Sequence, residues 1–295
     1  MTAPHSAHSG SAQSRSAQSR LVLVGGHESD NGADLSFLGR CFDDVLIAAA
    51  GRSLHRTVSR LLDADDRAVL VLPMTFGRNP TFVADAAKTL KWLAVGEAET
   101  RIALCDSFGT PDHLIAWLRT AATQSAASDP AAAVVIAARS SNPFDDAELF
   151  RIAHLVLTHG AATEVDVACV DQDADVARSV NRLRKLGFDE TVVVPAGFAR
   201  SSSAEFGTGD LAGSRFYGPL MSEQAIVRVI AERIRDAEHN LGHGRNGISA
   251  GLEADHGHGY AHSHAFEEGQ HEHEHGHSHS HNHAGSSHTA LAHTH

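Results

Sequence analysis

The chain has 295 residues, of which 36 are acidic and 24 are basic, and its formal net charge is −12. This negative balance argues against a nucleic-acid-binding protein, which usually carries a basic face. No run approaches the roughly 18 apolar residues that a membrane-spanning helix needs. Sixteen of the 23 histidines lie between His239 and His295. This uneven distribution excludes a globular protein of uniform composition.

The first 20 residues are rich in Ser, Ala and Gln and repeat the pentapeptide Ser-Ala-Gln-Ser-Arg at 11–15 and 16–20. They contain no apolar segment of the kind that a secretory signal requires. We therefore expect a disordered N-terminal tail at 1–20.

The body alternates short apolar runs with longer amphipathic stretches. The runs are continuous rather than alternating, which is typical of strands buried on both faces. They lie at 21–24, 45–50, 68–72, 102–105, 134–137, 165–170 and 191–194. Helical periodicity follows at 80–93, 145–157, 173–186 and 222–237. Alternation of strands and helices predicts an α/β fold with parallel sheets.

An internal repeat divides this body in two. Arg56–Leu61 matches Arg178–Leu183 and Val69–Pro73 matches Thr191–Pro195, both at an offset of 122 residues. The segment Val24–Asp30 matches Ile136–Asn142 at an offset of 112, which predicts a shortened first helix within about 34–44. We expect two similar halves around a cleft, at 21–128 and 129–238, with a linker at 123–130 and a disordered tail at 239–295.

Three cysteines, Cys41, Cys105 and Cys169, stand far apart. They form no Cys-x-x-Cys pair, so the sequence predicts neither a cysteine zinc site nor a disulfide framework. Reduced thiols in a cytoplasmic protein are the simplest interpretation.

Candidate site residues follow the carboxyl ends of the strands, where ligands bind in parallel sheets. His27 follows a strand and two glycines, and a neutral imidazole there can bind a metal or accept a proton. Glu28 can attract a cation or act as a base. The alternative for His27 is a loop histidine that only makes hydrogen bonds. Gly25-Gly26 lacks the full dinucleotide fingerprint, so no nucleotide is expected.

Several motifs together resemble the class II tetrapyrrole chelatases, which include the sirohydrochlorin cobaltochelatases and ferrochelatase relatives. His27-Glu28-Ser29 resembles the family's His-Gly-Ser motif, and Pro73–Asn79 partly resembles its Pro-x-Phe/Leu-x-x-Gly-x-His stretch. Ala138–Pro143 is similar to its Gly-Arg-Gly-Ser-Ser-Asp-Pro loop, and Tyr217–Leu220 to its closing Leu-Gly-Pro motif. The chain departs from the pattern at Glu28, which replaces a glycine, and at Asn79, near the second site histidine.

The resemblance implies a sirohydrochlorin-like tetrapyrrole and a divalent metal as substrates, with Co²⁺ first and Ni²⁺, Fe²⁺ or Zn²⁺ as alternatives. It implies that His27 and Glu28 act on the metal and the pyrrole protons. The implied substrate-binding residues are Ser29, Arg78, Asn79, Arg139, Ser141 and Arg200. Arginine suits tetrapyrrole carboxylates because its planar fork makes bidentate bonds. His113 is a second candidate metal ligand, although a helix-capping role also suits its position.

The C-terminal segment interleaves histidines with Gly, Ser, Glu and Asn, which cannot form a core. Alternating imidazoles can supply several ligands to one late transition-metal ion. The predicted metal-binding residues are His271, His273, His275, His277, His279, His281 and His283. A tail that only solubilises the protein is the alternative.

The sequence is compatible with three functions. The first is a metal chelatase of the sirohydrochlorin cobaltochelatase type, with no nucleic-acid or membrane partner. The second is a non-catalytic protein that stores or delivers metal on a chelatase scaffold. The third is a module that binds a tetrapyrrole alone.

Overall fold

The computed structural model describes residues 19–42 and 44–254. Its strands are β1 (Arg20–Gly25), β2 (Leu46–Ala49), β3 (Val69–Met74), β4 (Ile102–Leu104), β5 (Ala133–Arg139), β6 (Val165–Val170), β7 (Thr191–Pro195) and β8 (Ser214–Phe216). Its α-helices are α1 (Arg52–Ala64), α2 (Pro80–Leu93), α3 (Pro111–Ser128), α4 (Pro143–His159), α5 (Asp173–Lys185), α6 (Glu223–Gly242) and α7 (Ile248–Leu252). Three 3₁₀ segments are η1 (His27–Arg40), η2 (Gly96–Thr100) and η3 (Gly209–Leu211).

The strands form two parallel sheets of four strands each. The first sheet has the order β2-β1-β3-β4, and the second has the equivalent order β6-β5-β7-β8. This confirms the predicted α/β fold in two similar halves. In the first half, η1 occupies the place that α4 takes in the second, and its residues Ser29–Gly32 leave helical geometry. The predicted shortening of the first helix is therefore confirmed.

Each sheet buries both faces, as the continuous apolar runs predicted. Leu21 and Leu23 of β1 point into one cluster of buried side chains, whereas Val22 and Val24 point into another on the opposite face. The second of these clusters lies beneath α1, α2 and α7. The alternation follows from the two-residue period of a strand.

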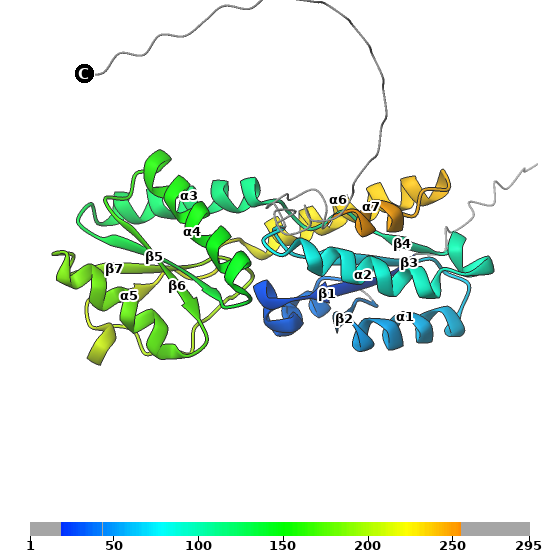
Figure 1. The fold of residues 1–295 in the computed structure, drawn as a ribbon, viewed down its shortest axis with the longest axis horizontal. Helices are drawn as coiled ribbons and strands as arrows, with labels where there is room; N and C mark the ends of the chain where they lie inside the picture. Colours follow the sequence, from blue (N-terminus) through cyan, green and yellow to red (C-terminus); the bar gives the residue numbers. More distant parts are fainter. Residues whose placement is uncertain (1–18, 43, 255–295) are drawn as a thin grey trace, which may run out of the picture. The chain divides into compact units, whose positions relative to one another are not determined.

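The last helix of each half packs against the sheet of the other half. The helix α3 follows β4 but contacts β5, β7 and α4, while α6 follows β8 but contacts β3 and β4 (Figure 1). As a result, one hydrophobic cluster contains Leu72 and Leu118 from before residue 129 together with Ile136 and Ile230 from after it. The sequence boundary at 128/129 remains a prediction, since this exchange makes the two halves share a core.

Three phenylalanines mark the junction between the halves. Phe76 and Phe198, which occupy equivalent positions of the repeat, stack with centroids 5.4 Å apart and ring planes 21° apart. Phe108 meets both rings edge-on, at centroid distances of 5.5 and 5.0 Å. Phe76 and Phe198 are almost fully buried, so the repeat places its two copies of one residue in contact at the centre of the fold.

Several expectations need correction. Helices α1 and α3 and the short strand β8 were not predicted, although Leu54, Val58 and Leu61 of α1 are buried at helical spacing. The expected linker at 123–130 is mostly helix, because α3 continues to Ser128 and buries Ser125.

The folded region also extends beyond the expected start of the C-terminal tail at residue 239. Helix α6 continues to Gly242, and α7 packs on α2 and β4 with Ile248 buried. The amide of Leu104 at the end of β4 donates to the carbonyl of Asn246, at 2.8 Å. Residues 1–18 and 255–295, including the predicted metal ligands His271–His283, lie outside the described residues.

None of the described helices is both long and apolar enough to cross a membrane.

Cys105 is buried at the end of β4, and burial raises the pKa of its thiol to about 12. Cys169 is half-buried on β6, and burial raises its pKa to about 11. Neither thiol is ionised near neutral pH, which favours a structural role for both.

We predict that Phe76 and Phe198 stabilise the fold cooperatively. Each substitution by Ala is expected to lower the free energy of unfolding by about 3–5 kcal/mol, as for other buried aromatic side chains. A double-mutant cycle is expected to give a coupling of about 0.5–1.5 kcal/mol, measured by urea denaturation. As a control, Phe76→Ala combined with Phe216→Ala should be additive within about 0.5 kcal/mol, because these rings are not partners.

Candidate functional site

The turn after β1 places His27 where the two halves meet. The chain doubles back so that Gly32 approaches Gly25, and a Cβ on Gly25 would lie 2.2 Å from the Gly32 nitrogen. Asp30, Asn31 and Gly32 all have positive φ, and the amide of Asn31 donates to the carbonyl of Gly26 at 2.8 Å. Only glycine fits at position 25, because the backbone of Gly32 leaves no room for a Cβ there. This tight turn fixes the start of η1.

Glu28 joins the two halves from a fully buried position. Its Oε2 accepts a hydrogen bond from the amide of Phe76 at 2.6 Å, and its Oε1 accepts one from Nε of Arg78 at 3.1 Å. Its backbone carbonyl accepts a hydrogen bond from the amide of Phe198 in the second half, at 3.0 Å. The side chains of Glu28 and Arg78 are 1% and 0% exposed. Such a buried ion pair is maintained only when hydrogen bonds satisfy its charges.

Three nitrogens beside this pair are buried without a hydrogen-bond partner. They are Nε2 of His27 and both terminal nitrogens, Nη1 and Nη2, of Arg78. A buried polar atom without a partner costs free energy, so each such atom in a folded protein calls for an explanation such as a ligand. The two terminal nitrogens of a guanidinium group can donate parallel hydrogen bonds to one carboxylate.

The surroundings of His27 favour its neutral form. Burial is the main cause that lowers the pKa of His27, and the positive charge of Arg78 acts in the same direction. The negative charges of Glu28, Asp145 and Asp146 oppose this effect. A neutral imidazole with a free ring nitrogen can either bind a metal ion or accept a proton.

The second half contributes an acidic loop to the same region. Asp145 is buried in the first turn of α4, and burial raises its pKa while a hydrogen bond from Ser141 lowers it. Its Oδ2 accepts hydrogen bonds from Ser141 Oγ at 2.8 Å and from Asn142 Nδ2 at 2.9 Å. Asp146 accepts from Ser140 Oγ at 2.9 Å. Strand β5, which leads into this loop, contacts η1, so this part of the second half lies next to the turn after β1.

Among the residues predicted from sequence, this region brings together His27, Glu28, Arg78, Arg139 and Ser141. Arg139 Nη2 lies 2.9 Å from Oδ2 of Asp30, which links the second half to the turn after β1. Ser29 is fully buried at the same turn, where its Oγ donates to the carbonyl of Gly26.

Three other predicted residues have local structural partners. Asn79 is the N-cap of α2, where its Oδ1 accepts from the amide of Phe82 at 3.0 Å. His113 is exposed and forms a capping box with Thr110 at the start of α3, as the capping alternative proposed. Arg200 pairs with Glu223 at 3.2 Å and lies 4.4 Å above the Phe37 ring.

The sequence predictions missed Asp145, Asp146 and Cys169. Cys169 of β6 pairs with Ala138 of β5, the strand that leads into the acidic loop. The two aspartates follow Asn142-Pro143-Phe144, in the first turn of a helix that begins after the carboxyl end of β5. That position was the available signal, since ligands bind at such helix starts in parallel α/β sheets.

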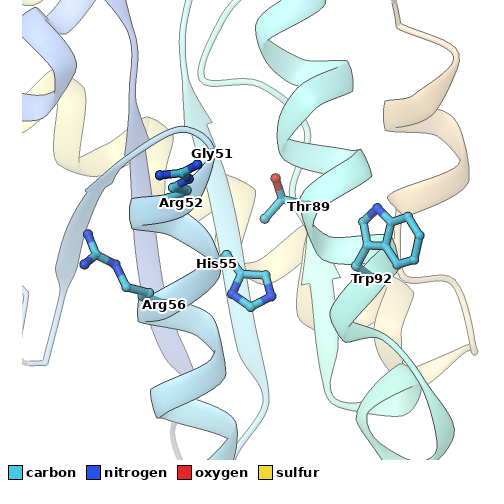
Figure 2. A pocket seen from close by; sticks show the side chains of 6 residues that line it. All are labelled: Gly51, Arg52, His55, Arg56, Thr89 and Trp92. Carbon is cyan, nitrogen blue, oxygen red and sulfur yellow. The ribbon is translucent and has the colours of Figure 1, made fainter.

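Within residues 19–42 and 44–254, no group of three or more His, Cys, Asp or Glu side chains is arranged to hold a metal ion. A pocket of about 520 Å³ lies between α1 and α2, away from all the predicted site residues (Figure 2). It is lined by Gly51, Arg52, His55, Arg56, Thr89 and Trp92.

No protein-family model and no curated protein matches the chain. The chain is similar to the solved structure of SirB from Bacillus subtilis with Fe³⁺, at 13% identity and a TM-score of 0.44, over 78% of this chain and 99% of SirB. It is similar to the sirohydrochlorin chelatase SirB from Bacillus subtilis subspecies spizizenii in complex with cobalt, at 14% identity and a TM-score of 0.42, over 76% and 97%. A multi-domain Deinococcus radiodurans protein with structural similarity to chelatases is matched at 15% identity and a TM-score of 0.44, over 76% and 60%.

We predict that Glu28→Ala strongly destabilises the protein, because it leaves the buried guanidinium of Arg78 without its counter-charge. The expected loss in the free energy of unfolding is about 3–5 kcal/mol, measured by urea denaturation. Lys88→Gln removes an exposed ion pair with Asp85 and should change stability by at most about 1 kcal/mol. Equal effects of the two substitutions would show that the buried pair contributes no more than a surface pair.

We predict that His27 makes stability depend on pH. Because its pKa is lowered in the folded state, the unfolded chain binds more protons below pH about 6.5, and stability is lost as pH falls through that value. The free energy of unfolding should fall more steeply between pH 7.5 and 5 for the unsubstituted chain than for His27→Gln. Both are measured by urea denaturation with a chelator present, and parallel curves would contradict the prediction.

Proposed function

We propose that the protein is a tetrapyrrole metal chelatase of the sirohydrochlorin type. The observation that carries this proposal is the buried, unpartnered Nε2 of His27 beside two unpartnered terminal nitrogens of Arg78. A metal ligand and a carboxylate-binding group next to each other suit a metal ion and a polycarboxylate as joint substrates. The motif resemblance at His27–Ser29, Pro73–Asn79 and Ala138–Pro143 supports the same class of substrate.

In this proposal, His27 first binds the incoming ion and then accepts a proton. Insertion forms bonds from the metal to the ring nitrogens, and the two pyrrole N–H groups lose their protons, one to Nε2 of His27 once the metal has left it and the other to solvent water. The metal keeps its oxidation state, so no redox partner or nucleotide takes part. A lowered pKa keeps the imidazole neutral and able to bind metal near neutral pH. Asp145, which interacts electrostatically with His27, stabilises the imidazolium that forms after proton transfer.

Arg78 holds a carboxylate of the tetrapyrrole through its free terminal nitrogens. Further candidates for substrate contacts are Ser29, Arg139, Ser141 and Arg200.

We assign Glu28 a positioning role, in place of the catalytic role that the family resemblance implied. Both of its carboxylate oxygens already accept hydrogen bonds, from Phe76 and Arg78. It fixes the direction of the guanidinium rather than stripping water from the metal.

Co²⁺ is the proposed metal substrate, with Ni²⁺, Fe²⁺ or Zn²⁺ as alternatives. Imidazole binds all of these ions, and affinity alone rises from Fe²⁺ through Co²⁺ to Ni²⁺. A site with one histidine and no group of three ligands holds an ion weakly, which helps release into the ring.

A second candidate function is non-catalytic metal storage or delivery. The position of Asn79 favours it, because this side chain caps α2 where the family pattern has its second histidine. The two functions differ in one measurable property, which is the rate of metal insertion.

We expect the protein to accelerate the spectral change of sirohydrochlorin with Co²⁺ above the spontaneous rate. His27→Ala should lower the catalysed rate by about 10²–10⁴-fold, the usual contribution of a general base. His55→Ala, which removes an exposed histidine on α1, serves as the control and should retain the rate. No acceleration by the unsubstituted protein would support the storage or delivery function, whereas full activity of His27→Ala would move the site elsewhere.

A further inference from the structure

Two histidines face each other at the C-terminal end of α6. His239 lies in the last turn of the helix, and His243 is its C-cap residue. Both are exposed, and their ring centroids are 4.6 Å apart with ring planes at 67°. Residues four apart lie on the same face of a helix, so the backbone itself places the two rings together.

The separation of the rings suits a shared metal ion. A metal–nitrogen bond of about 2.0–2.1 Å places each ring centre about 3.2 Å from the ion. For nitrogen–metal–nitrogen angles between square and tetrahedral values, the two ring centres are then about 4.5–5.2 Å apart. The observed 4.6 Å falls within this range, so rotation of the two rings about their side-chain bonds can bring a nitrogen of each to one ion.

The local electrostatics also favour a cation. The carbonyl groups at the C-terminal end of a helix carry partial negative charge, which attracts positive ions. Asp236 and Arg235, one turn earlier, carry opposite charges that offset each other. Selectivity for a metal therefore comes from the two imidazoles and the helix end rather than from an acidic cluster.

The histidine pair lies near the start of β1, whereas His27 follows the end of the same strand. Glu238, next to His239, accepts a hydrogen bond from Ser19, which directly precedes β1, at 2.8 Å. His27 follows the other end of β1. Six residues of strand extend about 20 Å, so the two histidine sites cannot hold the same ion.

We propose that His239 and His243 form a preassembled site for one late first-row divalent ion, such as Ni²⁺, Cu²⁺, Zn²⁺ or Co²⁺. Borderline imidazole ligands select this group of ions over Mg²⁺ and Ca²⁺. The two histidines supply two ligands, and water supplies the others. The site holds metal on the folded body and does not depend on the proposed chelatase function.

The test is histidine modification by diethyl pyrocarbonate on the full chain at pH 7.5, mapped by peptide mass spectrometry. Saturating Ni²⁺ should abolish modification of both His239 and His243, whereas the same concentration of Mg²⁺ should not. In His239→Ala, modification of His243 in the presence of Ni²⁺ should return to its metal-free rate. The peptide containing His55 reports the dose of reagent in every sample.

A matched control keeps two histidines but changes their spacing. The double variant Asn240→His with His243→Asn places them at adjacent positions, which do not face each other on a helix. Protection by Ni²⁺ should be lost in this variant. Persistent protection of His243 in His239→Ala would overturn the two-histidine site, as would unprotected His239 and His243 in the unsubstituted chain.

Discussion

The centre of the molecule depends on the hydrogen bonds and the ion pair that the buried Glu28 carboxylate makes. A charge in this position is tolerated because Arg78 and the amide of Phe76 hydrogen-bond to it. The backbone of the same residue receives the amide of Phe198 from the other half. Gly197 has to approach closely for this contact, since a Cβ there would lie 2.5 Å from the Glu28 carbonyl oxygen. One residue thus fixes the turn that carries His27, the orientation of Arg78 and the junction of the halves.

Duplication explains the symmetry of the core, and divergence explains the asymmetry of the site. Phe76 and Phe198 retain equivalent roles and stack on each other. The arginines that follow them differ, because Arg78 is buried against Glu28 while Arg200 pairs with Glu223. In the repeat, Arg139 stands at the position of His27. One half therefore offers an imidazole and a guanidinium, and the other offers the carboxylates of Asp145 and Asp146.

The two proposed metal positions differ in ways that suit different tasks. His27 is a partly buried single imidazole next to a carboxylate-binding arginine, and such a position favours brief binding and proton transfer. His239 and His243 are exposed and paired, which favours retention of an ion through two bonds. Their separation by the length of β1 allows metal to be held on the protein without obstructing the junction of the halves.

The sequence by itself determined the α/β class and the duplication, because buried strands leave local patterns. It also predicted His27 as the leading site residue from its place in a strand-end turn. It also indicated Arg78, through the resemblance of Pro73–Asn79 to a family motif. Only the tertiary structure showed that α3 and α6 pack on each other's sheets, that Asn79 and His113 cap helices, and that β5 of the second half contacts η1, which begins at His27. The physical reason is that hydrophobic periodicity records which face of an element is buried, but not which distant element covers it.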